Sequence, residues 1–318
     1  MKGTAFCLLF PLLAWTLAAQ EPVTEDPVGI ESSPGFFIQL VSSPGVKLGF
    51  NWHFTIPFLR GDGPLTQGNN IRVTPGVELT PIDVHLTADA VWTPIAFLEL
   101  VAGAGIGSGW SVNLFDNDIH GIGLNLADGD GMSMHDGSAF DGVLFRSRVG
   151  AALQGDLAAF FPGEWNHLVF RSFHEIGYFA YSRAGDGQAW FFENDAGENR
   201  NGFGYRGNLL IGYQMPIFLD MVALMAEAEL FLTRMPGGNR WGDDRLRWTF
   251  SCVLGFALTE RMGAALVTQF RTQRRYISNP DFPGQAQRDL HFTNRILDTD
   301  NPRRLEFYRV VLALTYRF

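Results

Sequence analysis

A serine and a histidine two residues apart are the side chains best suited to covalent chemistry. Ser172 and His174 belong to a segment of alternating character, so both would lie on one face of an extended strand. A serine hydroxyl becomes a nucleophile when a histidine base lies within hydrogen-bond reach. The pair therefore raises the hypothesis of a hydrolase. The alternative is structural, because a β-bulge would turn His174 inward, towards Arg171 and Glu175.

An acidic segment, residues 113–142, is the second candidate site. It contains no lysine or arginine, and its aspartates are Asp116, Asp118, Asp128, Asp130, Asp136 and Asp141. The run Asp116-x-Asp118-x-His120 resembles a calcium loop, but it departs from the EF-hand at its fifth position and lacks the terminal glutamate. We therefore predict neither a metal site nor a cofactor, and interpret the segment as a solvated acidic loop.

Glycines at alternate positions form a third motif, at Gly103, Gly105, Gly107 and Gly109. A phosphate-binding loop requires G-x-G-x-x-G spacing and a following helix, and this segment has neither. The intervening positions are mostly apolar, so the glycines are predicted to form the inward face of a strand. There they would let a barrel wall curve or leave room for an inserted loop.

Composition narrows the class of protein that must position these residues. Charged residues make up 18% and aromatic residues 14% of the chain, and the mean hydropathy is +0.03. An ordinary soluble domain has about 25% charged residues. Beyond the N-terminus no stretch approaches the roughly 18 apolar residues of a spanning helix, which excludes a bundle of membrane helices. The net charge of -9 argues against nucleic acid as a partner.

The N-terminus has the pattern of a secretory signal peptide. Lys2 precedes an apolar run over residues 5–17, and Ala18 and Ala19 provide a small-residue cleavage site. We predict cleavage after Ala19, because the apolar run is short for an uncleaved membrane anchor. Cys252 is then the only cysteine of the mature chain, so no intrachain disulfide can form.

Alternation with a period of two predicts β-strands along the rest of the chain. In the last of them, the even positions from Tyr308 to Phe318 are all apolar, whereas the odd positions include Arg309 and Arg317. A soluble β-sandwich would also alternate, but its strands are typically about 5–6 residues long. A transmembrane barrel instead has strands of about 10 residues or more, with aromatic residues at both rims. The predicted strand lengths favour the barrel.

With its signal sequence and its final strand ending in an aromatic residue, the chain resembles the bacterial outer-membrane β-barrel proteins. The resemblance implies that the barrel-assembly machinery reads the apolar face of the last strand, formed by Tyr308, Val310, Leu312, Leu314, Tyr316 and Phe318. It also implies a location in the bacterial outer membrane, contact with outer-membrane lipid, and N- and C-termini in the periplasm. The resemblance is to the superfamily and identifies no subfamily.

We predict an all-β, antiparallel up-and-down transmembrane barrel of twelve strands. They lie near residues 36–42, 45–58, 71–79, 82–93, 97–112, 143–160, 167–182, 203–215, 219–235, 247–259, 261–277 and 304–318. Ten strands is the alternative, because the first strand is short and the turn at Pro81 is a weak signal. The predicted organisation is a signal peptide at 1–19, a periplasmic leader at 20–34 and the barrel at 35–318.

The hydrolase hypothesis for Ser172 and His174 has a counterpart among outer-membrane proteins. Outer-membrane lipid hydrolases place a catalytic His and Ser two apart on a lipid-facing strand, in the order His-x-Ser followed by Asn. In this chain the order is Ser172-Phe173-His174 and no Asn follows. We therefore predict that the protein is not an enzyme and keep lipid hydrolysis as a second alternative.

Charges on the inward faces favour a porin-like channel for small polar solutes or ions. An acidic wall is predicted at Glu78, Asp83, Asp89 and Glu99, and a basic wall at Arg271, Arg275, Arg309 and Arg317. Diffusion porins orient polar solutes between such opposed walls. The first alternative is a non-conducting surface barrel with adhesive or structural loops, in which these charges pair and close the lumen. If residues 113–142 fold inward and constrict the channel, their six aspartates would favour cations as solutes.

Overall fold

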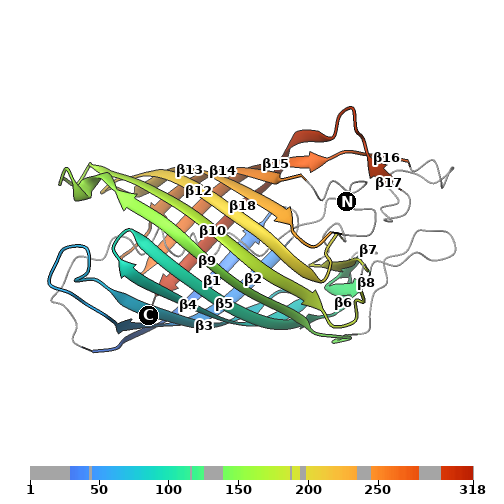
Figure 1. Ribbon diagram of the computed structural model, residues 1–318, viewed down its shortest axis with the longest axis horizontal. Helices are drawn as coiled ribbons and strands as arrows, with labels where there is room; N and C mark the ends of the chain where they lie inside the picture. Colours follow the sequence, from blue (N-terminus) through green and yellow to red (C-terminus); the bar gives the residue numbers. More distant parts are fainter. Residues whose placement is uncertain are drawn as a thin grey trace.

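The computed structural model describes residues 29–42, 45–114, 117–124, 139–186, 188–193, 198–234, 245–278 and 295–317. Within these ranges, twelve antiparallel strands close into a barrel (Figure 1). They are β1 (Glu31–Val41), β2 (Gly45–Pro57), β3 (Asn70–Leu79), β4 (Asp83–Ile95), β5 (Leu98–Gly109), β9 (Leu144–Asp156), β10 (His167–Tyr181), β12 (Gly202–Gln214), β13 (Leu219–Phe231), β14 (Arg247–Ala257), β15 (Met262–Arg274) and β18 (Arg303–Arg317). The predicted fold class is confirmed.

Neighbours in the barrel follow the order of the chain, and β1 closes the ring by pairing with both β18 and β2. The first strand has 11 residues and pairs with β2 from Glu31 to Val41. It thus begins inside the segment predicted as the leader. The turn around Pro81 joins β3 to β4, and the Thr80 amide donates to the Asp83 carbonyl at 3.0 Å. The prediction of twelve strands is therefore confirmed over ten.

Short strands in the long loops form three further two-stranded sheets in the described part of the chain. They pair β6 (Ser111–Leu114) with β7 (Asn117–His120), β8 (Ile122–Leu124) with β11 (Trp190–Phe192), and β16 (Tyr276–Ser278) with β17 (Arg295–Leu297). Figure 1 shows the labelled strands of these sheets at one end of the barrel, which we call the long-loop end. The short 3-10 helix η1 (Leu157–Ala159) follows β9. No helix in the described ranges is long and apolar enough to cross a membrane.

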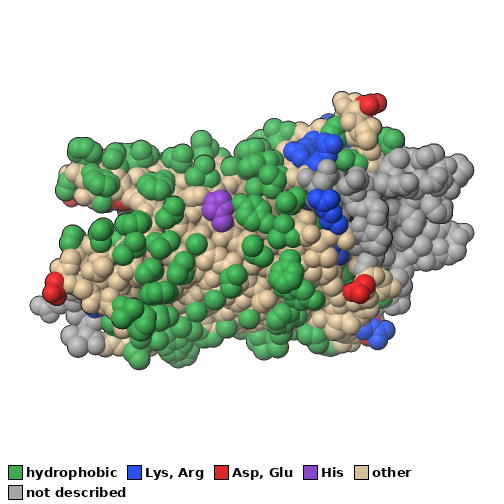
Figure 2. Space-filling view, viewed as in Figure 1, with side chains coloured by type: hydrophobic (Ala, Val, Ile, Leu, Met, Phe, Trp, Pro, Cys, Tyr) green, Lys and Arg blue, Asp and Glu red, His purple; other side chains and the backbone are tan. Residues whose placement is uncertain are grey.

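The outer wall of the barrel is apolar. Along β10 the exposed side chains include Leu168, Phe170 and Ile176, and along β2 they include Leu48 and Phe50. Figure 2 shows such side chains spread over the face of the barrel in view. An apolar outer face with polar groups inside is typical of a barrel that spans a membrane. The resemblance to outer-membrane barrels is thus confirmed at the level of the fold.

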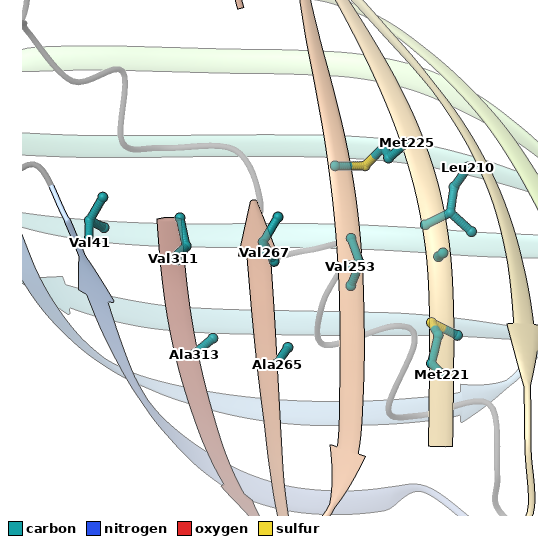
Figure 3. Close-up of a cluster of buried hydrophobic side chains, with 10 residues drawn as sticks. Val41, Leu210, Met221, Met225, Val253, Ala265, Val267, Val311 and Ala313 are labelled. Atoms are coloured by element: carbon teal, nitrogen blue, oxygen red, sulfur yellow. The ribbon is translucent and has the colours of Figure 1, made fainter. Parts of the chain in front are cut away.

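The inner wall is divided into an apolar zone and a charged zone. The apolar zone lies on β1, β12–β15 and β18, where buried side chains from neighbouring strands pack together (Figure 3). Its members include Val253 on β14, Val267 on β15 and Val311 on β18, and the last two are completely buried. The charged zone consists of the inward charged side chains that pair with one another, such as Glu78, Arg148, Glu175 and Glu229, and it contains the candidate site.

The last strand corrects one detail of the predicted pattern. The pairing of β18 with β15 shifts between Gln269 and Phe270, which face Arg309 and Phe307, so Tyr308 is the extra residue of a bulge. This extra residue changes the phase of the alternation, and Tyr308 lies against the guanidinium groups of Arg271 and Arg309. Tyr308 therefore does not continue the outer apolar face on which Leu312 is exposed.

Candidate functional site

The glycines of β5 make room for long side chains from the neighbouring strand. A Cβ atom at Gly103 would lie 2.1 Å from Asp89 Oδ1 and 2.9 Å from Arg148 Nε. A Cβ atom at Gly105 would lie 2.8 Å from Arg146 Nε. Both arginines belong to β9, which pairs with β5, and they reach across the glycines to acids on β3 and β4. Any larger residue would displace these guanidinium groups.

Gly109, the last of the alternating glycines on β5, makes room for a loop. A Cβ atom there would lie 3.2 Å from the Cα atom of Gly121, which precedes β8. The backbone amide of Gly121 donates to the Trp110 carbonyl at 2.9 Å, which holds the two segments together. The predicted space for an inserted loop is therefore present at the long-loop end.

Two members of the predicted acidic wall pair with bases on nearby strands. Glu78 accepts a hydrogen bond from Lys47 Nζ at 3.2 Å, and Arg146 lies 3.8 Å from the same oxygen. Asp89 Oδ1 accepts from Arg148 at 2.8 Å. These ion pairs link β2, β3, β4 and β9, on one side of the ring.

The other two members are more deeply buried. Glu99 accepts from Arg171 at 3.1 Å and lies 3.6 Å from Arg72, with only 3% of its side chain exposed. Asp83 is completely buried, accepts a hydrogen bond from the Thr80 hydroxyl and lies 3.5 Å from His85 Nε2. The four acids thus share one part of the barrel, but partners neutralise Glu78, Asp89 and Glu99 locally.

The predicted basic wall is only partly assembled. Arg271 belongs to the charged zone described below, and Arg309 Nε donates to Gln269 Oε1 at 2.6 Å. Arg317 is the last residue of β18, opposite Gly35 on β1. The structure corrects the placement of Arg275, which lies at an exposed position because β15 ends one residue earlier.

The densest basic group surrounds Glu229 on β13. Its Oε2 atom accepts from Arg247 Nε at 2.9 Å and from Arg271 at 3.1 Å. Arg206 lies 3.7 Å from Oε1 of the same carboxylate and 3.8 Å from Glu175. One carboxylate therefore faces three guanidinium groups from three strands, β12, β14 and β15.

Sequence reasoning missed four inward arginines of the lumen, although a signal was present. Arg146, Arg148, Arg206 and Arg247 occupy the inward phase of strands that were correctly predicted. Reading that phase along β9, β12 and β14 as well as along the last two strands would have identified them. The alternation cannot predict which acid each arginine contacts.

Two long loops meet inside the mouth of the barrel and form what we call the loop insert, β8 and β11 with residue 193. Ile122 on β8 and the β11 residues Trp190 and Phe192 are buried in one apolar cluster with Leu144 and Tyr181 of the barrel wall. The prediction that the 113–142 loop folds inward agrees with this described part of it. Asp116, Asp128, Asp130 and Asp136 lie outside the described residues, as does the side chain of Asp118, and Asp141 lies 3.6 Å from Arg183.

The loop insert crosses the lumen. The loop that carries β11 connects β10 to β12, yet Glu193 accepts a hydrogen bond at 3.1 Å from Lys47 on β2, on the far side of the ring. Glu193 adopts a φ of 49°, which is uncommon for a residue other than glycine, and its amide donates to the Gly121 carbonyl at 2.7 Å. Burial raises the pKa of the Glu193 carboxyl above its usual value, while the Lys47 ammonium acts in the opposite direction.

A cavity of about 230 Å³ lies inside the barrel, beside the arginines around Glu229 and residues 198–200 of the loop after β11. Its walls include Arg148, Arg206 and Arg247 from the strands and Arg200 from the loop after β11. Side chains of both signs thus face this space. Among the described residues, no group of three or more His, Cys, Asp or Glu side chains is placed to hold a metal ion.

Ser172 and His174 lie on the opposite, outer face of the wall. Ser172 Oγ is 3.1 Å from His174 Nε2, and His174 Nδ1 is 2.8 Å from the hydroxyl of Tyr205 on the next strand. The register of β10 with β9 and β12 runs without a break through both residues. The predicted bulge is therefore absent at this place in the described register, and His174 does not turn towards Arg171 and Glu175.

Small neighbours leave space around this histidine. In the register His174 lies between Ala151 on β9 and Gly207 on β12. A Cβ atom at Gly207 would lie 2.5 Å from the Tyr205 hydroxyl and 3.0 Å from His174 Nδ1. Sequence reasoning identified the serine and the histidine but not the tyrosine, because Tyr205 comes from another strand.

No protein-family model matches the chain, and no curated protein matches it. Among solved structures, the KdgM porin is 9% identical over 91% of this chain and 99% of that chain, with a TM-score of 0.39. An outer membrane channel from Pseudomonas putida is 11% identical over 94% of this chain and 99% of that chain, with a TM-score of 0.44. A Salmonella typhi outer membrane phospholipase dimer with bound calcium is 11% identical over 96% of each chain, with a TM-score of 0.23.

Proposed function

We propose that the protein is a porin-like channel of the outer membrane for small polar solutes or ions. The observation that supports this best is the charged cavity inside a barrel whose outer wall is apolar. Charged groups inside a membrane are costly and are usually retained where they line a water-filled path. Arg206 and Arg72, with 43% and 31% of their side chains exposed, remain open to such a path.

The alternative is a non-conducting surface barrel. It is supported by the ion pairs of Glu78, Asp89 and Glu99 and by the loop insert, all of which take up space in the lumen. In this function the loops would be adhesive or structural, and the charges would make the barrel rigid. The partners would then be surface molecules instead of solutes.

Conductance across a planar lipid bilayer separates the two functions. A channel gives discrete ion-conducting steps when the folded protein inserts, and deletion of residues 118–138 enlarges those steps because it removes part of the proposed constriction. If the aspartates of this loop set the charge preference, the deletion also weakens selectivity for cations. Folded protein that inserts without conducting would exclude the channel.

Lipid hydrolysis is the second alternative, and the hydrogen bonds between Ser172 and His174 and between His174 and Tyr205 are the observation in its favour. Depth in the membrane argues against it. Ser172 is the sixth residue of β10, so it lies about 12 Å from the strand end at about 3.3 Å per residue and a tilt of about 45°. This is near the middle of a hydrocarbon core about 30 Å thick, whereas lipid esters lie at its boundary.

We also propose two partners, outer-membrane lipid and the barrel-assembly machinery. The lipid would cover the apolar wall, and the machinery would bind the end of β18. The outward residues there, such as Leu312 and Leu314, keep the alternating pattern, and the last residue of β18 pairs with Gly35 near the start of β1. Both termini would then lie in the periplasm, with the loop insert at the cell surface.

A further inference from the structure

Arginines outnumber acids around the cavity near Glu229. Arg206, Arg247 and Arg271 all contact this one acid. Glu175 and Glu227 are also near Arg206, and Glu175 is shared with Arg148, which donates to it at 3.0 Å. Of the described residues that line the cavity, seven are arginines and five are acids.

Arg206 is the arginine best placed to contact a solute. Its two ion pairs, at 3.7 and 3.8 Å, are longer than hydrogen bonds. Its side chain is 43% exposed, whereas its partners Glu175 and Glu229 are only 5% and 19% exposed. The carboxylates therefore lie behind the guanidinium group, whose donors face the cavity.

Space beside Arg206 comes from two glycines. Gly177 and Gly204 face each other in the register of β10 and β12, two residues from the Glu175 and Arg206 pair. Both glycines line the cavity, and a Cβ atom at Gly204 would contact only one atom, at 3.5 Å. A small molecule can thus approach the guanidinium group without displacing a side chain of the wall.

We propose that this arginine group binds a small anion whose charge is carried on oxygen atoms, a carboxylate or a phosphate. Guanidinium groups bind such anions through pairs of parallel hydrogen bonds, and Arg206 and Arg247 both line the cavity and both contact Glu229. The inference rests on the proposed channel function, for which it names the class of solute. It is opposite in sign to the cation preference predicted from the acidic loop.

Selectivity of the channel tests the proposal in the membrane. In a gradient of KCl, the Arg206→Gln variant should lower the permeability ratio of chloride to potassium by about threefold, because it removes one charge from a lumen whose low-dielectric walls focus the field. Arg304→Gln, at a position where the arginine is 69% exposed and pairs with Glu306, serves as the matched control and should leave the ratio unchanged. An equal ratio in wild type and Arg206→Gln would overturn the proposal.

Equilibrium binding tests it without any current. Isothermal titration calorimetry of the detergent-solubilised barrel would use succinate, inorganic phosphate and glycerol as probes. Arg206→Gln should weaken binding of the preferred anion by about tenfold, as expected for the loss of a charge-assisted hydrogen bond. Arg206→Lys, which keeps the charge without the paired donors, should give an intermediate affinity and remains informative if the glutamine variant does not fold.

The probes also separate the possible results. Binding of succinate alone assigns a carboxylate solute, and binding of phosphate alone assigns a phosphate solute. Binding without conductance would retain the anion site and reject the channel. Conductance without binding of either anion, or binding as tight to glycerol as to the anions, would reject the anion site and retain the channel.

Discussion

The two faces of β10 satisfy their polar side chains in different ways. Inward, Arg171 and Glu175 form ion pairs with charged residues of other strands. Outward, Ser172, His174 and Tyr205 form a short chain of hydrogen bonds, and none of the three needs a charge. An unpaired charge facing lipid is costly, whereas a lumen with water tolerates partly exposed ions. The inner face therefore presents charged groups to the lumen, where they can contact solutes. The outer face instead pairs its polar side chains with one another, so that none of them faces lipid without a hydrogen bond.

The inner face should be the more sensitive to loss of a single group. Glu229→Ala leaves Arg206, Arg247 and Arg271 without their shared carboxylate, and we expect the free energy of unfolding to fall by about 3 kcal/mol. Urea unfolding in detergent micelles, followed by tryptophan fluorescence, measures the change. Arg304→Ala is the control, because Arg304 is 69% exposed in its pair with Glu306 and such pairs contribute about 0–1 kcal/mol. Equal losses in the two variants would contradict the role assigned to Glu229.

The glycines beneath the inner ion pairs provide a second test, of intermediate size. Gly103→Ala should destabilise the barrel by about 1–3 kcal/mol, because its methyl group would overlap Asp89 and Arg148. Gly204→Ala is the matched control, since its methyl group would meet only the Leu230 carbonyl at 3.5 Å. The same unfolding assay applies to both variants. A stable Gly103→Ala protein with normal heat-modifiable gel migration would contradict this prediction, because it would show that the Arg148 side chain can move aside without loss of stability.

The outer face should be the least sensitive. Ser172→Ala should change the free energy of unfolding by less than about 1 kcal/mol, because it removes one neutral hydrogen bond. We also expect no change in fatty-acid release from phospholipid or lipid A vesicles. His174→Leu, which removes the centre of the hydrogen-bond chain, should behave in the same way. Release of fatty acid by the purified protein that stops in Ser172→Ala would instead make this group catalytic.

Alternation along the chain was sufficient to predict the barrel, because each strand needs one apolar and one polar face whatever its neighbours are. It also placed Glu78, Asp89 and Glu99 in the lumen. It did not reveal the phase change at Tyr308, since apolar residues continue on the even positions beyond it. A bulge is determined by the partner strand, and the partner lies outside any local window.

The contacts of the candidate site depend on still longer distances in sequence. Glu193 and Lys47 are separated by 146 residues, and no local sequence pattern near either residue predicts that they pair. Tyr205 likewise joins His174 from 31 residues away. Residue types and phase therefore predicted which groups face inward or outward, while the pairing of those groups required the register of the closed ring.

The contact of Glu193 with Lys47 also has a mechanical consequence. A thin-walled tube flattens easily when it is squeezed from the side, because its wall bends with little change in length. The β11 part of the loop insert is covalently attached at β10 and β12 and is held at β2 on the opposite side through Glu193, so it acts as a strut across the tube. The barrel then resists lateral pressure from the bilayer along the diameter from β10 and β12 to β2. It deforms more easily along the perpendicular diameter. Any change of cross-section in this barrel should therefore have a preferred direction.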